Sequence, residues 1–341
     1  IKVANAPAQE VVWLGRDLLN GHGLDMIPVP ISTPGFDNAP YLTSANWITK
    51  DIETGIYNIG NYRSQIKAPD RAGGFFVSQH MGQHWRRCKA KGKRLEACIA
   101  IGVVPSIAYS ATAKIPYDFD EYRLAGGLAG APMELVQAKT VDLLVPSTAE
   151  IIIEGTIPTD VIEPEGPFGE YTGYMGPAGN EPYFNIKCMT FRNKPLYQAF
   201  ISQMPPSESS CIRGIGREWP LLKHLRDNLH IPVKDLRLKE AGGSGAYLVI
   251  SLKKQFVGQV RQLMYGAWSL RTGFGKITVV VDDDIDVWDD FAVDWALSWR
   301  VRPDRDIYIE RDVQAVGLDP SQAPAGVLQH LVADGVQAGI A

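Results

Sequence analysis

The sequence of 341 residues contains few cysteines, and these lie far apart at Cys88, Cys98, Cys188 and Cys211. They form no CxxC pair, and no histidine lies near them at zinc-finger spacing, so the sequence offers neither a disulfide framework nor a zinc module. Isolated thiols of this kind are typical of a reducing compartment. We therefore expect reduced cysteines and a cytoplasmic protein.

The sequence also lacks a long hydrophobic run and an excess of basic charge. Its longest apolar stretch, residues 98–113, is interrupted by glycine, proline and serine and is shorter than the roughly 20 residues of a membrane-spanning helix. A total of 34 basic against 38 acidic residues gives a net charge of −4, which supplies no attractive field for nucleic acid or an anionic membrane. These absences favour a small-molecule partner.

What is present indicates a folded globular chain. Hydrophobic residues make up 45% and charged residues 21% of the sequence, which excludes a disordered or fibrous protein, and the length predicts two domains. The chain begins at Ile1, and its opening IKVANAPAQE has neither the basic nor the apolar segment of a signal peptide. We expect a processed, truncated or partly observed product.

The first 200 or so residues mostly predict β-structure. The spacing of Val11, Leu14 and Leu18 predicts a helix over residues 8–20. From about residue 25, short segments rich in β-branched and aromatic residues alternate with glycine, proline and asparagine, which predicts a largely antiparallel sheet or barrel. These segments are residues 41–48, 56–66, 74–78, 143–153, 184–191 and 196–201, and helices are expected near 82–92 and 120–128.

After about Pro206, strand and helix patterns alternate and predict an α/β unit with a parallel sheet. The expected strands are residues 247–252, 277–281 and 307–309, and the expected helices are 257–268 and 289–299. The last stretch, residues 321–341, has one charged residue, Asp334, and its apolar residues group as on one helix face. This pattern predicts a helical tail that packs on a neighbouring subunit.

An acidic loop over residues 162–174 is the most distinctive motif. Its three carboxylates, Glu163, Glu165 and Glu170, lie among glycines and prolines that favour a tight, extended loop. Carboxylates held close together in a partly apolar setting raise the pKa of one of them, as a general acid at neutral pH requires. A solvated surface loop shaped by proline is the alternative, and composition alone favours it.

A second group combines Asn58 with His80, and Glu121 is a candidate third member. Amide, imidazole and carboxylate side chains together suit a hard or borderline divalent metal ion. Spacing alone is weak evidence for such a site. For His84, one helical turn further on, we favour a packed or surface histidine without a ligand role.

Three other patterns have simpler interpretations. The Asp282–Asp284 run ends an apolar strand, where α/β proteins often bind ligands, but turn formation and a helix cap before Asp289 explain it better. Residues 242–245 (GGSG) resemble a phosphate loop only superficially, because no GK[ST] follows, and predict a plain turn. A core or interface role is expected for Trp288, Trp295 and Trp299.

Taken together, these motifs resemble those of the UbiD-like decarboxylases, whose cofactor is prenylated FMN. The resemblance spans roughly residues 25–310 and includes one long run that is hard to match by accident. It is carried by residues 58–63 (NIGNYR), 78–80 (SQH), 115–121, 145–155 (VPSTAEIIIEG), 164–170 (PEGPFGE) and 281–286 (VDDDID).

The resemblance implies an α+β or α/β fold with a central split β-barrel of flavin-reductase type, followed by a C-terminal α/β domain. It also implies that most of an N-terminal α/β domain is absent from this chain, with residues 1–24 as its remnant. The cofactor-binding barrel is then expected over residues 25–205, an oligomerisation domain over 206–320, and the tail over 321–341. Family members form homodimers and often homohexamers.

The resemblance also implies roles for single residues. Arg63, Glu165 and Glu170 match the Glu-Arg-Glu network of the family, with Glu170 at the position of the proton donor. Asn58, His80 and Glu121 match the ligands of a divalent metal, Mn²⁺ or Mg²⁺, that joins the protein to the cofactor phosphate. Potassium is expected beside that metal, held partly by backbone carbonyls. The full set of expected cofactor contacts is Thr43, Asn58, Ile59, Arg63, Gln79, His80, Ala111, Thr112, Ala113, Glu121 and Lys276.

The activity that follows is a non-oxidative, reversible decarboxylation of an aromatic, heteroaromatic or α,β-unsaturated carboxylic acid, with CO₂ as product and a flavin prenyltransferase as cofactor supplier. Two alternatives stay open: a flavin reductase or oxidoreductase on the same split barrel, and a subunit of a multi-subunit carboxylase.

Two departures from the family leave the network intact and put the substrate in doubt. Where many members read PPDE, residues 205–208 read PPSE. Residues 111–113 read ATA, where members carry small polar residues.

Overall fold

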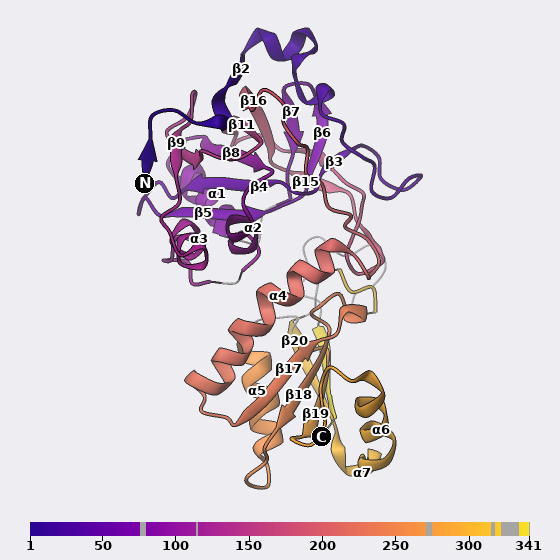
Figure 1. The fold of residues 1–341 in the computed structure, drawn as a ribbon. Helices are drawn as coiled ribbons and strands as arrows, with labels where there is room; N and C mark the ends of the chain where they lie inside the picture. The colour runs from indigo at the N-terminus through magenta and orange to yellow at the C-terminus, as the bar shows by residue number, and fades with distance from the viewer. Residues whose placement is uncertain (76–79, 114, 271–274, 315–317, 322–333, 341) are drawn as a thin grey trace. The chain divides into compact units, whose positions relative to one another are not determined.

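The computed structural model describes residues 1–75, 80–113, 115–270, 275–314, 318–321 and 334–340 (Figure 1). Contacts divide the chain into two compact units. Unit 1 comprises Ile1–Gly169 and Ala178–Ile201, and unit 2 comprises Glu170–Pro177 and Ser202–Ala341. In the part of the chain that the structure describes, no helix is long and apolar enough to cross a membrane.

Unit 1 is built on a nine-stranded sheet in which every neighbouring pair is antiparallel. The strand order is β3-β6-β7-β16-β11-β8-β4-β5, and β2 also pairs with β16. The antiparallel sheet expected from the sequence is therefore confirmed. The strands are β2 (Val11–Leu14), β3 (Tyr41–Leu42), β4 (Asn46–Lys50), β5 (Tyr57–Asn61), β6 (Ser64–Ala68), β7 (Arg71–Gly73), β8 (Leu95–Ile101), β11 (Ile151–Ile157) and β16 (Tyr183–Phe191).

Strand β11 lies inside this sheet, between β16 and β8, and both of its faces are buried. All seven of its residues are buried, and four of them are isoleucine, so neither face of the strand meets water. Successive side chains of a strand point to opposite faces. Ile153 packs in one core cluster with Trp47 and Phe184, and Ile152 packs in a second cluster with Ile48.

Short helices and small sheets complete unit 1. Helix α3 begins after Asp120, because the Asp120 carboxylate accepts a hydrogen bond from the Tyr122 N–H at 2.7 Å and caps the helix. Gly130 ends the helix in the left-handed conformation. The elements are η1 (Pro7–Gln9), η2 (Leu18–His22), η3 (Leu24–Met26), α1 (His80–Ala90), α2 (Pro105–Ser110), α3 (Glu121–Ala129), β1 (Lys2–Val3), β9 (Leu135–Gln137), β10 (Leu144–Pro146), β12 (Glu163–Glu165), β13 (Phe168–Gly169) and β15 (Gly179–Glu181).

Unit 2 contains a five-stranded sheet in the order β17-β18-β19-β21-β20. Its centre is parallel, from β18 through β19 to β21, but β17 and β20 join antiparallel at the two edges. The predicted parallel sheet is thus correct only for the centre. The elements are β14 (Met175–Gly176), α4 (Glu208–Lys223), η4 (His224–Asn228), β17 (Val233–Leu238), η5 (Glu240–Gly242), β18 (Tyr247–Leu252), α5 (Gln259–Leu270), β19 (Ile277–Asp282), α6 (Asp290–Arg300), α7 (Pro303–Asp306), β20 (Ile307–Gln314) and β21 (Asp334–Ile340).

Two predictions for the N-terminal segment differ from the structure. Residues Val11–Leu14 form strand β2 and not a helix, because they pair with Cys188–Phe191 of β16. A partner strand far along the chain thus overrides the local helical spacing. Residues 1–24 were expected to be the remnant of a separate domain, but β1 pairs with β9 and β2 pairs with β16 inside unit 1.

Two predictions nearer the C-terminus also differ. Residues 196–201 form no strand. The predicted helical tail is wrong for Asp334–Ile340, which form strand β21 between β19 and β20, because that position completes two ladders of backbone hydrogen bonds. The apolar group at residues 327–332, on which the helix prediction rested, lies outside the described residues.

The simpler interpretations of two motifs agree with the structure, and that of a third is partly wrong. Arg300 forms a two-bonded ion pair with Asp284 at 2.8 and 2.6 Å, and Asp289 caps α6. Residues 242–245 form a turn with Gly243 at a φ of +61°. The core role expected for Trp288, Trp295 and Trp299 is wrong, because all three side chains are exposed in the described chain. Their interface role stays a prediction.

The core of unit 1 generates a prediction about stability. Phe184 is fully buried and meets Trp47 edge-on with ring centres 5.0 Å apart. Phe184→Ala should lower the free energy of unfolding by about 3–5 kcal/mol, because it removes apolar contact and leaves a cavity. Phe36 is 66% exposed in the same unit, and Phe36→Ala should change it by less than about 0.5 kcal/mol. Urea unfolding curves of both variants that coincide would contradict this assignment of the core.

Candidate active site

The centre of the candidate site is a buried ion pair between Arg63 and Glu165. The Arg63 Nε donates to Glu165 Oε1 at 3.0 Å, and its Nη2 donates to Oε2 at 2.7 Å. The side chains are 8% and 1% exposed. Two parallel N–H···O bonds match the planar guanidinium to the carboxylate and fix the orientation of both groups. Two of the three predicted network residues are therefore in contact.

Aromatic rings surround this pair. The guanidinium carbon of Arg63 lies 4.6 Å from the ring centre of Phe75 and 5.2 Å from that of Phe168. Burial, and after it the Glu165 carboxylate, raises the pKa of Tyr41 well above its ordinary value, so its phenol stays neutral. The Glu165 carboxylate and the two rings thus hold the guanidinium of Arg63 in one plane.

The predicted metal residues come together at one end of β5. Asn58 lies on that strand, and the N–H of the next residue, Ile59, donates to Glu121 Oε2 at 3.0 Å. The other oxygen of Glu121 lies 4.0 Å from Nδ1 of His80. His80 and Glu121 are the first residues of α1 and α3. Strand β5 and the first residues of two helices thus bring His80 and Glu121 close to each other and to the backbone next to Asn58.

These residues fit a divalent cation. The side-chain nitrogen of Asn58 is buried and has no hydrogen-bond partner in the described part of the chain. Because the hydrogen-bond network decides which end of an amide is oxygen, such an unpartnered end can present a carbonyl oxygen to a cation. Among the described residues, no group of three or more His, Cys, Asp and Glu side chains could hold a metal, and the set here contains only two residues of those types.

The sequence analysis did not predict the network of ring contacts and hydrogen bonds next to His80. The ring of Tyr117 meets the His80 ring edge-on, with centres 5.2 Å apart. Its hydroxyl donates to the Asp51 carboxylate, which also accepts a hydrogen bond from Arg87. The network fixes the wall against which His80 packs. Asp51 follows strand β4 without any motif, so the sequence carried no signal for this contact.

His84 is a packed residue, as its sequence pattern favoured. It is 1% exposed, and its Nδ1 lies 2.9 Å from the hydroxyl of Thr49. Burial lowers the pKa of His84 to about 4. The ring is therefore neutral near pH 7 and forms part of the core below α1.

The Ala111–Ala113 segment lies beside β5. It follows α2, and the N–H groups of Thr112 and Ala113 both donate to the Tyr109 carbonyl at 3.0 Å. The carbonyl of Ala111 accepts a hydrogen bond from the N–H of Asn61, the last residue of β5, at 3.2 Å. A carbonyl has a second lone pair, so this segment can offer oxygen to a cation near the metal residues.

Thr43 joins two distant segments of unit 1 through hydrogen bonds to Phe200. Its hydroxyl donates to the Phe200 carbonyl at 2.6 Å and accepts from the Phe200 N–H at 2.9 Å. This pair of bonds ties the chain after β16 to the start of the sheet. A contact between Thr43 and the cofactor stays a prediction.

Three further predicted site residues lie in unit 2 or outside the described residues. Glu170 belongs to unit 2, where it is 8% exposed and its N–H donates to the Tyr174 carbonyl at 3.0 Å. Lys276, also in unit 2, forms an ion pair with Asp319 at 2.7 Å. Gln79 lies outside the described residues. The roles of all three stay predictions.

The PPSE sequence at 205–208 has a structural explanation. Ser207 is the N-cap of α4: its hydroxyl accepts from the Ser210 N–H at 3.3 Å, and its N–H donates to the Ser210 hydroxyl at 3.0 Å. Serine and aspartate are both favoured N-cap residues. The change from the family pattern therefore keeps the helix start and removes one negative charge.

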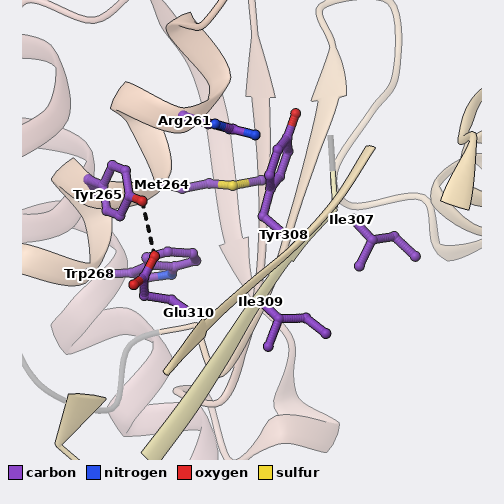
Figure 2. Close-up of a pocket in the computed structure, with 8 residues that line it drawn as sticks. All are labelled: Arg261, Met264, Tyr265, Trp268, Ile307, Tyr308, Ile309 and Glu310. Atoms are coloured by element: carbon purple, nitrogen blue, oxygen red, sulfur yellow. Dashed lines mark hydrogen bonds between the residues drawn. The ribbon is translucent and has the colours of Figure 1, made fainter. Parts of the chain in front are cut away.

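A separate cavity of about 300 Å³ lies between α5 and β20 of unit 2 (Figure 2). In its wall, the Tyr265 hydroxyl donates to the Glu310 carboxylate at 3.0 Å. The cavity is lined by Arg261, Met264, Tyr265, Trp268, Ile307, Tyr308, Ile309 and Glu310. None of the predicted site residues lines it.

Comparison with family models and known proteins covers nearly the whole chain. The model of the 3-octaprenyl-4-hydroxybenzoate carboxy-lyase Rift-related domain (UbiD) matches residues 1–205, and that of the C-terminal domain of this carboxy-lyase (UbiD_C) matches residues 210–340. A phenolic acid decarboxylase of Bacillus subtilis is 33% identical over 91% of this chain and 66% of its own length. The chain spans 62% to 66% of the lengths of the first curated relatives it matches.

Two solved structures are similar over the whole fold. One is the UbiD-class enzyme HmfF from Pelotomaculum thermopropionicum in complex with FMN, with a TM-score of 0.89 and 32% identity over 100% of this chain and 73% of that one. The other is an evolved dimeric form of HmfF in complex with prFMN, with a TM-score of 0.86 and 33% identity over 99% and 73%. The fold class predicted from the sequence is thereby confirmed.

The ligand set predicts a metal affinity that can be measured directly. His80→Ala should weaken Mn²⁺ binding at least about tenfold, because it removes one of three converging donors. His22 is exposed elsewhere in unit 1, so His22→Ala should bind Mn²⁺ like the wild type. Isothermal titration calorimetry provides the comparison. Equal affinity of the wild type and His80→Ala would remove His80 from the ligand set.

Proposed function

The chain belongs to the UbiD family, and we propose that it is a carboxy-lyase that uses prenylated FMN to decarboxylate an aromatic, heteroaromatic or α,β-unsaturated carboxylic acid. The observation that carries this proposal is the buried, two-bonded pair of Arg63 and Glu165. A buried guanidinium held in a fixed plane is suited to a second carboxylate, that of the substrate. The flavin complexes of the two HmfF structures and the activity in the name of the Bacillus relative also support it.

Arg63 binds and orients the substrate carboxylate in this scheme. Glu165 keeps the guanidinium in its plane, and the rings of Phe75 and Phe168 restrict it further, so that the Arg63 side chain is 8% exposed. In a site with little water, the attraction between Arg63 and a carboxylate is stronger than in solution. The leaving group is CO₂, so the interaction with Arg63 weakens as the carboxylate charge disappears.

A proton must replace the lost CO₂ at the same carbon. Prenylated FMN, when bound, supplies the electron sink that side chains cannot provide for the departing carboxylate's electron pair. Glu170 is the residue we assign as proton donor: it is buried, and its backbone is fixed by the bond to Tyr174. The net reaction converts RCO₂⁻ and H⁺ to RH and CO₂, and it is reversible.

Asn58, His80 and Glu121 would hold Mn²⁺ or Mg²⁺, with the Tyr117 ring supporting His80. The cation would neutralise the cofactor phosphate, together with the positive N-terminal end of helix α1, which begins at His80. Potassium would lie at the carbonyls of the Ala111–Ala113 segment. Thr43, Gln79 and Lys276 are assigned as further cofactor contacts.

A flavin prenyltransferase would supply the cofactor, and the assembly would be a homodimer or homohexamer. A flavin reductase on the same fold would have no use for a buried Arg63–Glu165 pair. The experiments below therefore separate the two activities.

The first test identifies the cofactor and the reaction. Protein co-expressed with a flavin prenyltransferase and purified without oxygen should release prenylated FMN, detected by mass spectrometry, and should form CO₂ from at least one of a broad panel of aromatic and unsaturated acids. Glu170→Gln should abolish turnover and keep the bound flavin, because it removes a proton donor and little volume. Loss of flavin from this variant, or unmodified FMN in the wild type, would count against the proposal.

The second test addresses the ion pair. Arg63→Lys should lower kcat/KM roughly 100-fold, which corresponds to about 3 kcal/mol, because an ammonium group cannot form two parallel bonds to Glu165. Arg71→Lys is the matched control, because the side chain of Arg71 is 43% exposed and pairs with Glu163 at 2.8 Å. The control should retain wild-type activity. Full activity of Arg63→Lys would favour a flavin reductase.

A further inference from the structure

A third carboxylate lies on the same face as the Arg63–Glu165 pair. Strands β12 and β15 form an antiparallel ladder in which Glu163 faces Glu181 and Glu165 faces Gly179. The residues between them, Pro164 and Asn180, are exposed, so the three glutamates share the inner face of the ladder. Because Gly179 has no side chain, only Glu181 projects from β15 on that face, diagonal to Glu165.

The three carboxylates differ in their partners. Glu163 pairs with Arg71 at 2.8 Å and lies 3.4 Å from Lys67, and Glu165 has its two bonds to Arg63. One oxygen of Glu181 is buried and has no hydrogen-bond partner in the part of the chain that the structure describes. A buried carboxylate oxygen left without a donor favours the protonated form of the group.

The surroundings of Glu181 also favour its protonated form. Burial, and then the like charge of Glu165, raises the pKa of Glu181 to about 7, while the positive charge of Arg63 opposes this rise. The charged groups of unit 1 that face the ladder are Arg63 before β6, Lys67 on β6, Arg71 on β7, and Glu163 and Glu165 on β12. Glu181 is thus poised to exchange a proton near neutral pH.

We propose that Glu181 is a positioning residue of the Arg63–Glu165 pair, which binds a proton when a second carboxylate reaches Arg63 and releases it when that carboxylate is gone. The inference rests on the proposed function, in which that carboxylate belongs to the substrate. A substrate anion at Arg63 offsets the positive field that keeps Glu181 ionised. Uptake of one H⁺ by the Glu181 carboxylate then restores the charge balance around the pair, without any other bond formed or broken.

Protonation of Glu181 should strengthen substrate binding. Since the substrate anion favours protonated Glu181, protonated Glu181 equally favours the substrate. Binding should therefore be tightest below pH 7 and weaken as the pH rises above the pKa of Glu181, which is about 7 in the free protein. Glu181→Gln imitates the protonated form, so its KM should lose this pH dependence while kcat stays within a few-fold of the wild type.

Infrared difference spectroscopy of the full chain tests the proposal without requiring turnover. A protonated-carboxyl band should titrate near pH 7 in the wild type, be absent in Glu181→Gln, and persist in the matched control Glu163→Gln. Glu165→Gln should move the midpoint down by roughly one unit, and Arg63→Gln should move it up by a similar amount, because they remove a like and an opposite charge. Glu181→Asp should restore a titrating carboxyl if Glu181→Gln folds poorly.

Saturating benzoate, the probe for a substrate carboxylate, should raise the midpoint of the wild type. The proposal is overturned if no carboxyl titrates near pH 7, if the band survives in Glu181→Gln, or if neither the two charge variants nor benzoate moves it. The assays separate this result from the proposed function. Decarboxylation without the Glu181 band contradicts only the role of Glu181, whereas the band and its shifts without any decarboxylation contradict only the carboxy-lyase.

Discussion

The cost of removing Arg63 and Glu165 from water is the constraint around which unit 1 is organised. Each charge loses several kcal/mol of hydration on burial, and only well-aligned bonds and nearby favourable groups offset that loss. The two residues are 102 positions apart in sequence. The antiparallel sheet brings Arg63, just before β6, against the end of β12, and the Phe75 and Phe168 rings lie against the guanidinium. The Arg63–Glu165 pair therefore depends on the order of the strands, and the chemistry that we assign to this site depends on the pair.

The same sheet also positions the metal residues, through β5. The hydrogen bond from the Ile59 backbone to Glu121 joins the strand to α3, and the bond from Asn61 to the Ala111 carbonyl joins it to the segment after α2. A single strand thus connects three parts of the chain that would bind a cation and a phosphate. Tyr117 and Asp51 support this arrangement from behind. Rigid backbone contacts of this kind hold a ligand set in place before the ligand arrives.

The sequence was informative where the pattern is local and uninformative where a distant partner decides. The helix expected over residues 289–299 lies within one residue of α6, because its pattern is local, whereas the strand expected over 143–153 reaches only the first three residues of β11. Val11–Leu14 and Asp334–Ile340 were assigned to helices because the strands that pair with them lie elsewhere in the chain. Glu181 carries no motif: its setting arises from the register of β12 and β15, which places glycine opposite Glu165. The positions of Arg63 and Glu165 were predicted through a family pattern, whereas their burial and bonding required the fold.

The position of strand β21 in its sheet affects how unit 2 assembles during synthesis. It lies between β19 and β20 in the sheet, although it follows both in sequence. During synthesis, β20 therefore emerges before the strand that connects it to the rest of the sheet, and the edge of β19 stays open meanwhile. An open edge can pair with another chain. On the ribosome, the interval between the emergence of β20 and of β21 is thus the period in which unit 2 is most exposed to misassembly, whereas the β11 centre of unit 1 already has all of its partners.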